Sequence, residues 1–339
     1  MLWEDARLLR NAGMPVQVYG SAAKQGAPVS IVPVRTSAPL ITSWEYCAPF
    51  VLRERESVLM ACNEPTVAAL APDRTVVRFE WQTPLPRYWK LPGWLPRFQR
   101  ARYLFLSESD RSEFLQHHSL IPLDATIVIP YFVDRQVFRP KPRPAARPLR
   151  VGFAGQWVQR KGCVTLLEAW RIVRQTFREA ELWFAGSDKL WKANVPTPGS
   201  EEVAREIRDA ASEGCLRIAG EFSRAEMPRF WNELDIAVVP SFEEPFGLVA
   251  LEALSCGIPV VACKVGGLTE IVVDGESGLL IPPREAEPLA RALLTLLTNE
   301  PLRLRLAEGA TRRAGEFSVE RRTGELLQLV RERREKARP

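Results

Sequence analysis

Glutamates interrupt an otherwise apolar segment, SFEEPFGLVALEALSCGIPVVAC (residues 241–263). Glu243 and Glu244 stand at its start, and Glu252 lies in its middle. A charged carboxylate in apolar surroundings is costly unless it is paired or hydrogen-bonded. Hydroxyl groups of a ligand could supply those hydrogen bonds, so we interpret the segment as one wall of a binding site. In the alternative interpretation, Glu243 and Glu244 cap a helix and Glu252 pairs with an internal arginine.

A second segment with chemical potential is basic and contains glycine. FAGQWVQRKG (residues 153–162) places Arg160 and Lys161 between Gly155 and Gly162. Glycine allows a ligand to approach the backbone, and a lysine ammonium can neutralise a phosphate. The segment matches neither the dinucleotide-binding glycine pattern nor the P-loop, so neither NAD binding nor ATP hydrolysis is indicated. The alternative is a basic pair exposed to water at the start of a helix.

The elements that must position both segments alternate regularly in the second half of the chain. Amphipathic stretches separate short runs that are apolar throughout, at residues 149–155, 181–186, 234–240 and 258–263. Such a pattern predicts an α/β domain with a doubly wound parallel sheet, which binds ligands beyond the carboxyl ends of its strands. A helix expected from Leu248 to Cys256 would begin at that edge. Its free N–H groups and positive dipole end favour an anion such as phosphate.

A stretch dense in proline and basic residues, 137–149, separates this domain from a first α/β domain. Closely spaced prolines cannot continue a helix or a central strand. We therefore predict an N-terminal domain over residues 1–140, a linker over 141–148 and a C-terminal domain over 149–317. A charged helix over 318–339 could pack back on the first domain. Because the chain opens on a helix, we expect the usual first strand of the N-terminal domain to be absent.

Composition limits the other function classes. The formal net charge of +5 suits an anionic ligand. The six cysteines form no CxxC pair and no metal-ligand spacing with the two histidines, so we expect no metal and a reducing, cytoplasmic location. No apolar run reaches the roughly 20 residues of a membrane span, and the start of the chain is unlike a signal peptide.

The glutamate segment resembles a known family. E-P-F-G-L-V-A-L-E, from Glu244 to Glu252, resembles the E-x7-E signature of the retaining glycosyltransferases of family 4, and residues 252–283 continue the likeness. GQWVQRKGCVTLLEAW resembles the family's G-R-L-x-x-x-K-G segment. ARYLFLSESDRSEFL and IVIPYFVDRQVFRP resemble it more loosely, so the likeness covers residues 101–330. It implies a GT-B fold, in which two Rossmann-like domains face each other across a cleft.

The resemblance also implies ligands and roles. A UDP-, GDP- or ADP-linked sugar donor would bind the second domain, and a glycan, lipid-linked or small-molecule acceptor would lie against the first. Glu252 would hold the ribose hydroxyls, and Glu244, as the catalytic residue, would contact hydroxyls of the transferred sugar. The remaining donor-binding positions would contact the diphosphate: Gly155, Arg160, Lys161 and the backbone N–H groups of Phe246, Gly247 and Leu248.

The chain contains no D-x-D pair that would chelate a metal-bound diphosphate. The resemblance therefore implies a metal-independent transfer with retention, with no cofactor besides the nucleotide sugar. Stabilisation of the leaving diphosphate would be its largest catalytic contribution.

Three departures from the family leave an alternative open. Gln156 stands where the family has a diphosphate-binding arginine, and residues 75–86 lack the histidine of many members, with Arg78 and Glu80 nearest that place. The expected absence of the first strand is the third. The alternative is a catalytically silent GT-B protein that binds a nucleotide sugar or a partner. A glycoside hydrolase with paired carboxylates is a third hypothesis, but it leaves the basic loop unexplained.

Aromatic and basic residues interleave over residues 84–102, PLPRYWKLPGWLPRFQRAR. This mixture favours a membrane interface or a phosphate-bearing lipid acceptor, which would place the protein peripherally at the inner face of the membrane. In the alternative, the loop packs its aromatics against its own domain. No fold typical of nucleic-acid binding is recognisable, so we expect no nucleic-acid partner.

Overall fold

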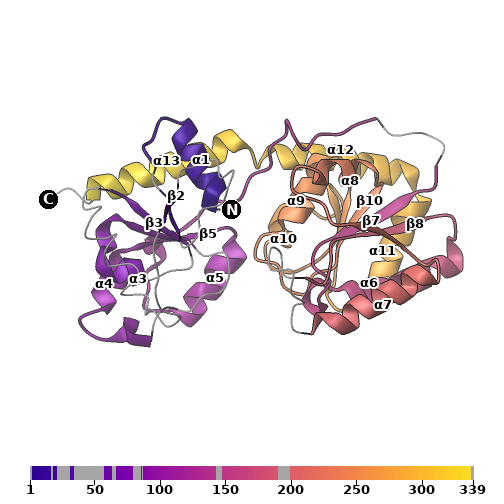
Figure 1. Cartoon of the computed structure of the whole chain (residues 1–339), viewed down its shortest axis with the longest axis horizontal. Coiled ribbons are helices and arrows are strands. Elements are labelled where there is room, and N and C mark those ends of the chain that lie inside the picture. Colours follow the sequence, from indigo (N-terminus) through magenta and orange to yellow (C-terminus); the bar gives the residue numbers. More distant parts are fainter. Residues whose placement is uncertain are drawn as a thin grey trace. The chain divides into compact units, whose positions relative to one another are not determined.

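The computed structural model describes residues 2–16, 18–20, 31–33, 57–62, 66–78, 85, 87–142, 147–189 and 199–336. It forms two compact units, each with a parallel sheet (Figure 1). One unit combines Met1–Tyr131 with Val319–Pro339, and the other is Phe132–Ser318. The predicted α/β class is therefore confirmed. The predicted domain and linker bounds stay a prediction.

The second unit is built on a six-stranded parallel sheet of order β12-β11-β10-β7-β8-β9. The strands are β7 (Arg150–Ala154), β8 (Glu181–Ala185), β9 (Arg217–Gly220), β10 (Ile236–Val239), β11 (Val260–Cys263) and β12 (Gly278–Ile281). The four central strands are apolar and largely buried because helices cover both faces. The strand order reverses between β7 and β10, which pair through Ile236 and Val151. This reversal is the point at which such sheets bind ligands.

Helices cover the two faces of this sheet. On one face lie α6 (Cys163–Thr176), α7 (Ser200–Ser212) and α11 (Ala286–Thr298), and on the other α8 (Met227–Asn232), α9 (Leu248–Ser255) and α12 (Glu300–Gly315) (Figure 1). The short α10 (Leu268–Ile271) packs beside α9. In α6 the buried Leu166, Trp170 and Val173 recur every three or four residues, so that one stripe of the helix faces the core.

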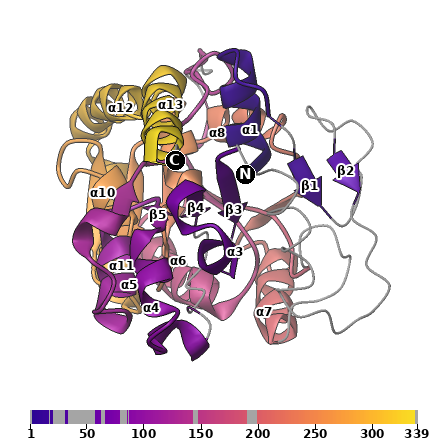
Figure 2. The same cartoon turned by 90° about the vertical axis from the view of Figure 1, so that its left-hand side faces the viewer.

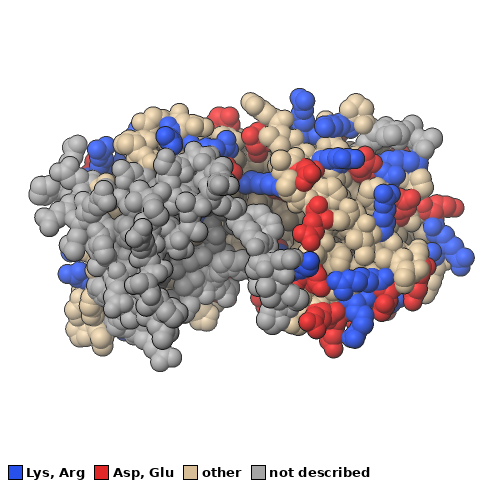
Figure 3. Space-filling model, viewed as in Figure 1, with Lys and Arg blue, Asp and Glu red and all other residues tan. Residues whose placement is uncertain are grey.

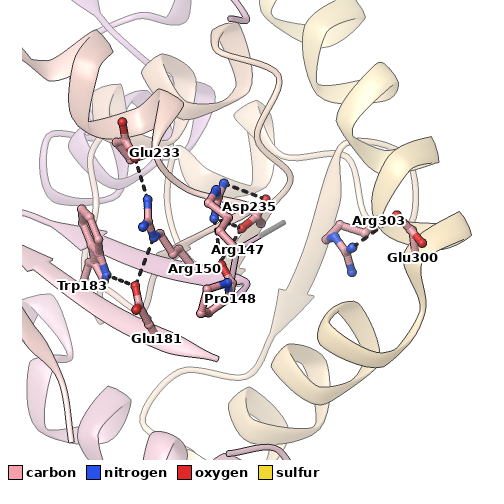
Figure 4. Close-up of polar contacts among 9 residues, drawn as sticks. All are labelled: Arg147, Pro148, Arg150, Glu181, Trp183, Glu233, Asp235, Glu300 and Arg303. Carbon is pink, nitrogen blue, oxygen red and sulfur yellow. Dashed lines mark hydrogen bonds and ion pairs between the residues drawn. The ribbon is translucent and has the colours of Figure 1, made fainter. Parts of the chain in front are cut away.

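The amino ends of the strands carry ion pairs instead of site residues (Figure 4). Arg147 makes two hydrogen bonds to Asp235, of 2.8 and 3.1 Å, just before β10. Arg150, the first residue of β7, bridges Glu181 at 3.0 Å and Glu233 at 2.6 Å. These pairs connect the start of β7 to β8 and to the residues just before β10. They stabilise the amino edge of the sheet, which lies opposite the carboxyl edge where sheets of this type bind ligands.

The first unit contains a four-stranded parallel sheet of order β3-β4-β5-β6 and a separate parallel pair, β1 and β2. Its strands are β1 (Val18–Gly20), β2 (Ile31–Pro33), β3 (Leu59–Cys62), β4 (Thr75–Arg78), β5 (Arg102–Phe105) and β6 (Thr126–Val128). Its helices are α1 (Leu2–Asn11), α3 (Thr66–Leu70), α4 (Leu95–Arg100), α5 (Glu108–His117) and α13 (Val319–Lys336).

The C-terminal helix α13 belongs to the first unit and packs beside α1 (Figure 2). Its Arg322 is buried and donates two hydrogen bonds to Asp5 of α1, of 2.7 and 2.9 Å. Asp5 also pairs with Arg78 at 2.5 Å. About three turns later on the same helix, Arg333 donates to the carbonyls of Pro72 and Arg100. Two buried arginines thus anchor the last helix to the body of this unit.

Candidate functional site

Two loops meet beyond the carboxyl ends of β7 and β10, where the strand order reverses. The loop after β7 carries the basic pair, and the loop after β10 carries Glu244. A backbone hydrogen bond of 2.8 Å from Phe242 to the carbonyl of Arg160 joins them. Gly162, the N-cap residue before α6, has φ of 70°, and a Cβ added to it would lie 2.0 Å from the Pro240 carbonyl oxygen. Only glycine permits this approach.

Lys161 and Glu244 are in direct contact. Lys161 Nζ lies 2.5 Å from Glu244 Oε2, and the Ser241 hydroxyl donates to the same oxygen at 3.2 Å. Both charged side chains are mostly buried, with exposed fractions of 17% and 13%. Glu244 thus accepts hydrogen bonds from side chains of both loops. In the alternative interpretation of the sequence it would have capped a helix.

Gly247 is the N-cap residue of the helix that follows, α9, so no side chain caps the start of that helix. Gly247 has φ of 99°, and a Cβ there would lie 2.7 Å from Leu268 Cδ2 of α10. Phe246 beside it is buried, while Leu248, the first helical residue, is half-buried. The free N–H groups of the first turn and the positive end of the dipole therefore lie at the carboxyl edge of the sheet, beside Glu244.

A glycine pair after β11 completes this part of the site and was missed by the sequence reasoning. Gly267 donates its N–H to the Glu244 carbonyl at 2.9 Å. At Gly266 a Cβ would lie 2.2 Å from that carbonyl oxygen. The signal was present, since two adjacent glycines stand shortly after an apolar strand, beyond its carboxyl end. Ser241 carried no comparable signal.

Glu252 is buried one turn inside α9, with an exposed fraction of 4%. Trp231 Nε1 of α8 donates to its Oε2 at 3.5 Å, and Arg224 Nε lies 3.9 Å from its Oε1. Burial raises the pKa of this carboxyl to about 7, and Arg224 and Trp231 only partly oppose the rise. In the described part of the chain, this long contact with Arg224 is what corresponds to the arginine pairing of the alternative interpretation. Sequence reasoning did not anticipate either partner, because both come from the segment before β10.

The other predicted positions are arranged less directly. Arg160 is half-buried next to Lys161. Gly155 donates to the Ala185 carbonyl at the end of β8, and the Gly155 carbonyl lies against Gly186, the residue after that strand. Gln156 Nε2 lies 3.4 Å from the Lys189 carbonyl oxygen, also after β8. The structure therefore brings Lys161, Glu244 and the start of α9 together, while Gly155 and Gln156 lie toward the neighbouring strand.

The aromatic–basic segment divides between core and surface. Trp89 and Phe98 are buried in the core of the first unit, as the packing alternative expected, whereas Trp94 is half-buried with Arg97 over its ring. Leu91 is 53% exposed. Residues 84 and 86 and the side chains of residues 87 and 88 lie outside the described part of the chain, as does residue 80.

Charge on the described surface of the second unit is mixed, with acidic and basic side chains interspersed on the face drawn in Figure 3. Among the described residues, no group of three or more His, Cys, Asp or Glu side chains could hold a metal ion. Within the same residues, no helix is both long and apolar enough to cross a bilayer.

Solved structures with the same fold are numerous. A glycosyltransferase from Rickettsia africae superimposes with a TM-score of 0.79 at 16% identity, over 97% of this chain and 93% of that one. Anabaena HepE, in complex with UDP and glucose, gives a TM-score of 0.74 at 21% identity, over 97% and 94% of the two chains. At these identities the likeness concerns the fold, and it confirms the predicted GT-B fold.

Curated relatives match a shorter part. A D-inositol 3-phosphate glycosyltransferase from Stackebrandtia nassauensis is 37% identical over 216 residues, which are 60% of this chain and 48% of that protein. The enzyme of the same name from Geodermatophilus obscurus is 34% identical over 244 residues, 67% of this chain and 52% of that protein. The chain therefore spans about half the length of the curated relatives it matches.

The family model described as glycosyl transferases group 1 matches residues 134–313. This stretch includes both loops, α9 and the glycine pair, so the match rests on the same residues as the geometry above. The chain belongs to the glycosyl transferases group 1 family.

Proposed function

We propose that this protein transfers a sugar from a nucleotide-sugar donor to an acceptor, with retention and without a metal ion. The single observation that carries the proposal is the meeting of Lys161 and Glu244 at the point where the strand order reverses. One side chain suits a phosphate and the other suits sugar hydroxyls. They lie beside an uncapped helix start, which adds further donors for an anion.

The diphosphate is assigned to Lys161, with Arg160 beside it. The backbone N–H groups around Phe246, Gly247 and Leu248, at the start of α9, are assigned to the same diphosphate as further hydrogen-bond donors. A nucleoside diphosphate is a good leaving group when its charge is neutralised, so these groups would supply the main catalytic effect. Its released phosphate oxygen could accept the acceptor's proton, which would make a separate general base unnecessary.

Glu252 is assigned to the ribose hydroxyls of the donor. This carboxylate has an exposed fraction of 4%, and its contacts with Trp231 and Arg224 in the described part of the chain are 3.5 and 3.9 Å long, so it retains acceptor capacity that hydroxyl groups could use. Burial raises the pKa of this carboxyl, and Arg224 and Trp231 oppose the rise only in part. Glu244, in the loop before α9, is assigned to hydroxyls of the transferred sugar, where it would orient the reacting carbon.

The relatives support this class of donor. Anabaena HepE was solved with UDP-glucose as well as with UDP and glucose, and the curated relatives are named as glycosyltransferases. We propose a UDP-, GDP- or ADP-linked sugar as donor and a glycan, lipid-linked or small-molecule acceptor on the side of residues 1–140. We place the protein in the cytoplasm, with no nucleic-acid partner and no cofactor besides the donor.

A contact with the inner face of a membrane is proposed through residues 84–102. The exposed Leu91 lies beside Lys90, and Arg97 covers Trp94 nearby. An exposed leucine among cations is typical of a surface that contacts anionic lipid. The burial of Trp89 and Phe98 removes two of the aromatic side chains from that role.

A catalytically silent protein that binds a nucleotide sugar is the second candidate. The observation in its favour is Gln156, an uncharged side chain that lies near the Lys189 carbonyl in place of the family's arginine. A panel of UDP-, GDP- and ADP-sugars separates the candidates when thermal stability and donor hydrolysis are both measured. Turnover of any donor supports the enzyme, whereas a raised melting temperature without hydrolysis or transfer supports the silent protein.

A further inference from the structure

The Lys161–Glu244 ion pair joins two residues to which the proposed function assigns different parts of the donor. Lys161 is assigned to the diphosphate and Glu244 to the sugar, yet in this structure each neutralises the other at 2.5 Å. An ammonium whose charge is already balanced attracts a diphosphate weakly. Donor binding at Lys161 therefore requires Glu244 to move away or to share its partner.

The backbone around the pair is fixed, so the side chains must make this movement. The Glu244 carbonyl accepts the Gly267 N–H at 2.9 Å, and Gly266 is pressed against the same carbonyl. Lys161 lies in a 3₁₀ turn, Gln159–Lys161, and its own N–H donates to the Val158 carbonyl at 3.0 Å. Among the described residues, Ser241 Oγ, at 3.2 Å, shares the carboxylate oxygen with Lys161.

We propose that Glu244 is a placeholder that makes the site select a sugar-bearing donor over the spent nucleoside diphosphate. This inference rests on the proposed function. A nucleotide sugar offers hydroxyls to the displaced carboxylate, so the loss of the ion pair is offset by new hydrogen bonds. A bare nucleoside diphosphate also displaces Glu244 from Lys161, but it lacks the transferred sugar whose hydroxyls would receive the carboxylate, and its ribose hydroxyls are assigned to Glu252. The pair thus disfavours retention of the product and assists its release.

The test is calorimetric titration of the full chain with UDP and with UDP-glucose, in parallel with GDP and ADP counterparts. The variants are Glu244→Gln, Ser241→Ala and Lys161→Ala/Glu244→Gln. Glu243→Gln is the matched control, because it removes the same charge from the exposed residue immediately before. Melting temperatures check that each variant is folded.

Glu244→Gln should bind the bare nucleoside diphosphate about 10-fold more tightly than the wild type, corresponding to about 1.4 kcal/mol. Its preference for the nucleotide sugar over the nucleoside diphosphate should fall. Ser241→Ala should also increase the affinity for the nucleoside diphosphate, but by less, because it removes one hydrogen bond to the Glu244 carboxylate and leaves its charge in place. Glu243→Gln should bind as the wild type does, and Glu244→Gln should bring no tightening when Lys161 is already alanine.

Two results would overturn the placeholder role while leaving the proposed function intact. One is a Glu244→Gln protein that binds the nucleoside diphosphate as the wild type does or more weakly. The other is an equal gain in nucleoside diphosphate affinity in Glu243→Gln, which would show that the lower negative charge of the protein causes the effect and not the loss of the ion pair. If the wild type binds no nucleoside diphosphate and no nucleotide sugar, the proposed function fails, and this inference fails with it.

Discussion

Replacing Glu252 by glutamine should stabilise the second unit at pH 8 and change it much less at pH 5. The carboxyl is almost fully buried, and its two polar contacts, to Trp231 and Arg224, are 3.5 and 3.9 Å long. Burial raises its pKa from the ordinary 4.5 to about 7. The folded protein therefore holds this proton more tightly than the unfolded chain does.

The sign and the magnitude follow from this difference. An acid whose folded-state pKa is raised contributes stability that is fully present below pH 4.5 and is lost as the pH rises through 7. At about 1.36 kcal/mol for each pH unit between the two values, the ionised Glu252 costs about 3 kcal/mol at pH 8. Glutamine remains neutral, and its carbonyl can still accept the Trp231 N–H. Most of that amount should reappear as stability, about 2 kcal/mol more at pH 8 than at pH 5.

Denaturant unfolding at the two pH values measures this prediction, with the transition of the second unit followed for wild type and Glu252→Gln. Glu168→Gln serves as control, because Glu168 is exposed on α6. At pH 8 the Glu252→Gln protein should also lose about 10-fold in nucleoside diphosphate affinity, since an amide accepts hydroxyl hydrogen bonds less strongly than a carboxylate. Equal effects at both pH values, or a loss of stability at pH 8, would refute the reasoning.

Three further substitutions test other parts of the account. Lys161→Ala should lower donor turnover about 100-fold or more, measured as donor hydrolysis at saturating donor, because the diphosphate loses its main countercharge; near-native turnover would remove that role. Gly247→Ala should lower the stability of the second unit by about 1–3 kcal/mol more than Gly275→Ala does. Both glycines have positive φ, but only a Cβ at Gly247 would meet a neighbouring side chain. Equal decreases in melting temperature for the two variants would contradict this. Arg322→Met should destabilise the first unit by about 3–5 kcal/mol, since it leaves the buried Asp5 carboxylate with one partner fewer. The control Arg321→Met, at an exposed residue, should cost less than about 0.5 kcal/mol. Similar denaturation midpoints for the two variants would count against the anchoring role of α13.

The second unit could be predicted well from the sequence. Its four central strands lie in the apolar runs expected at 149–155, 181–186, 234–240 and 258–263, whereas helices such as α6 show a buried stripe, so the period of the hydrophobic pattern distinguishes strand from helix. The edge strand β9, Arg217–Gly220, is more exposed and was not expected. Both loops of the site follow strands at one edge of the sheet, and parallel topology brings them together. The meeting of Lys161 with Glu244 could therefore be anticipated from chain order and sheet type.

Partners that come from distant segments could not be predicted in this way. Trp231 approaches Glu252 because α8 packs on α9, and no spacing in the sequence encodes that contact. The aromatic–basic segment shows the same limit, since Trp89 and Trp94 look alike in sequence but only the first is buried in the core. Arg322 likewise reads as one of several surface charges on a polar helix, although it is buried against Asp5.

The central claim is that a diphosphate binds where the loops after β7 and β10 meet. Titration of a nucleotide sugar into the wild type and into Lys161→Ala tests it most directly, with Lys189→Ala as control for a lysine on the loop after β8. We predict saturable binding by the wild type and by Lys189→Ala, and binding by Lys161→Ala that is weaker by about 10-fold or more, because the diphosphate loses a charge-assisted hydrogen bond. Undiminished binding by Lys161→Ala, or an equal loss in both variants, would contradict it.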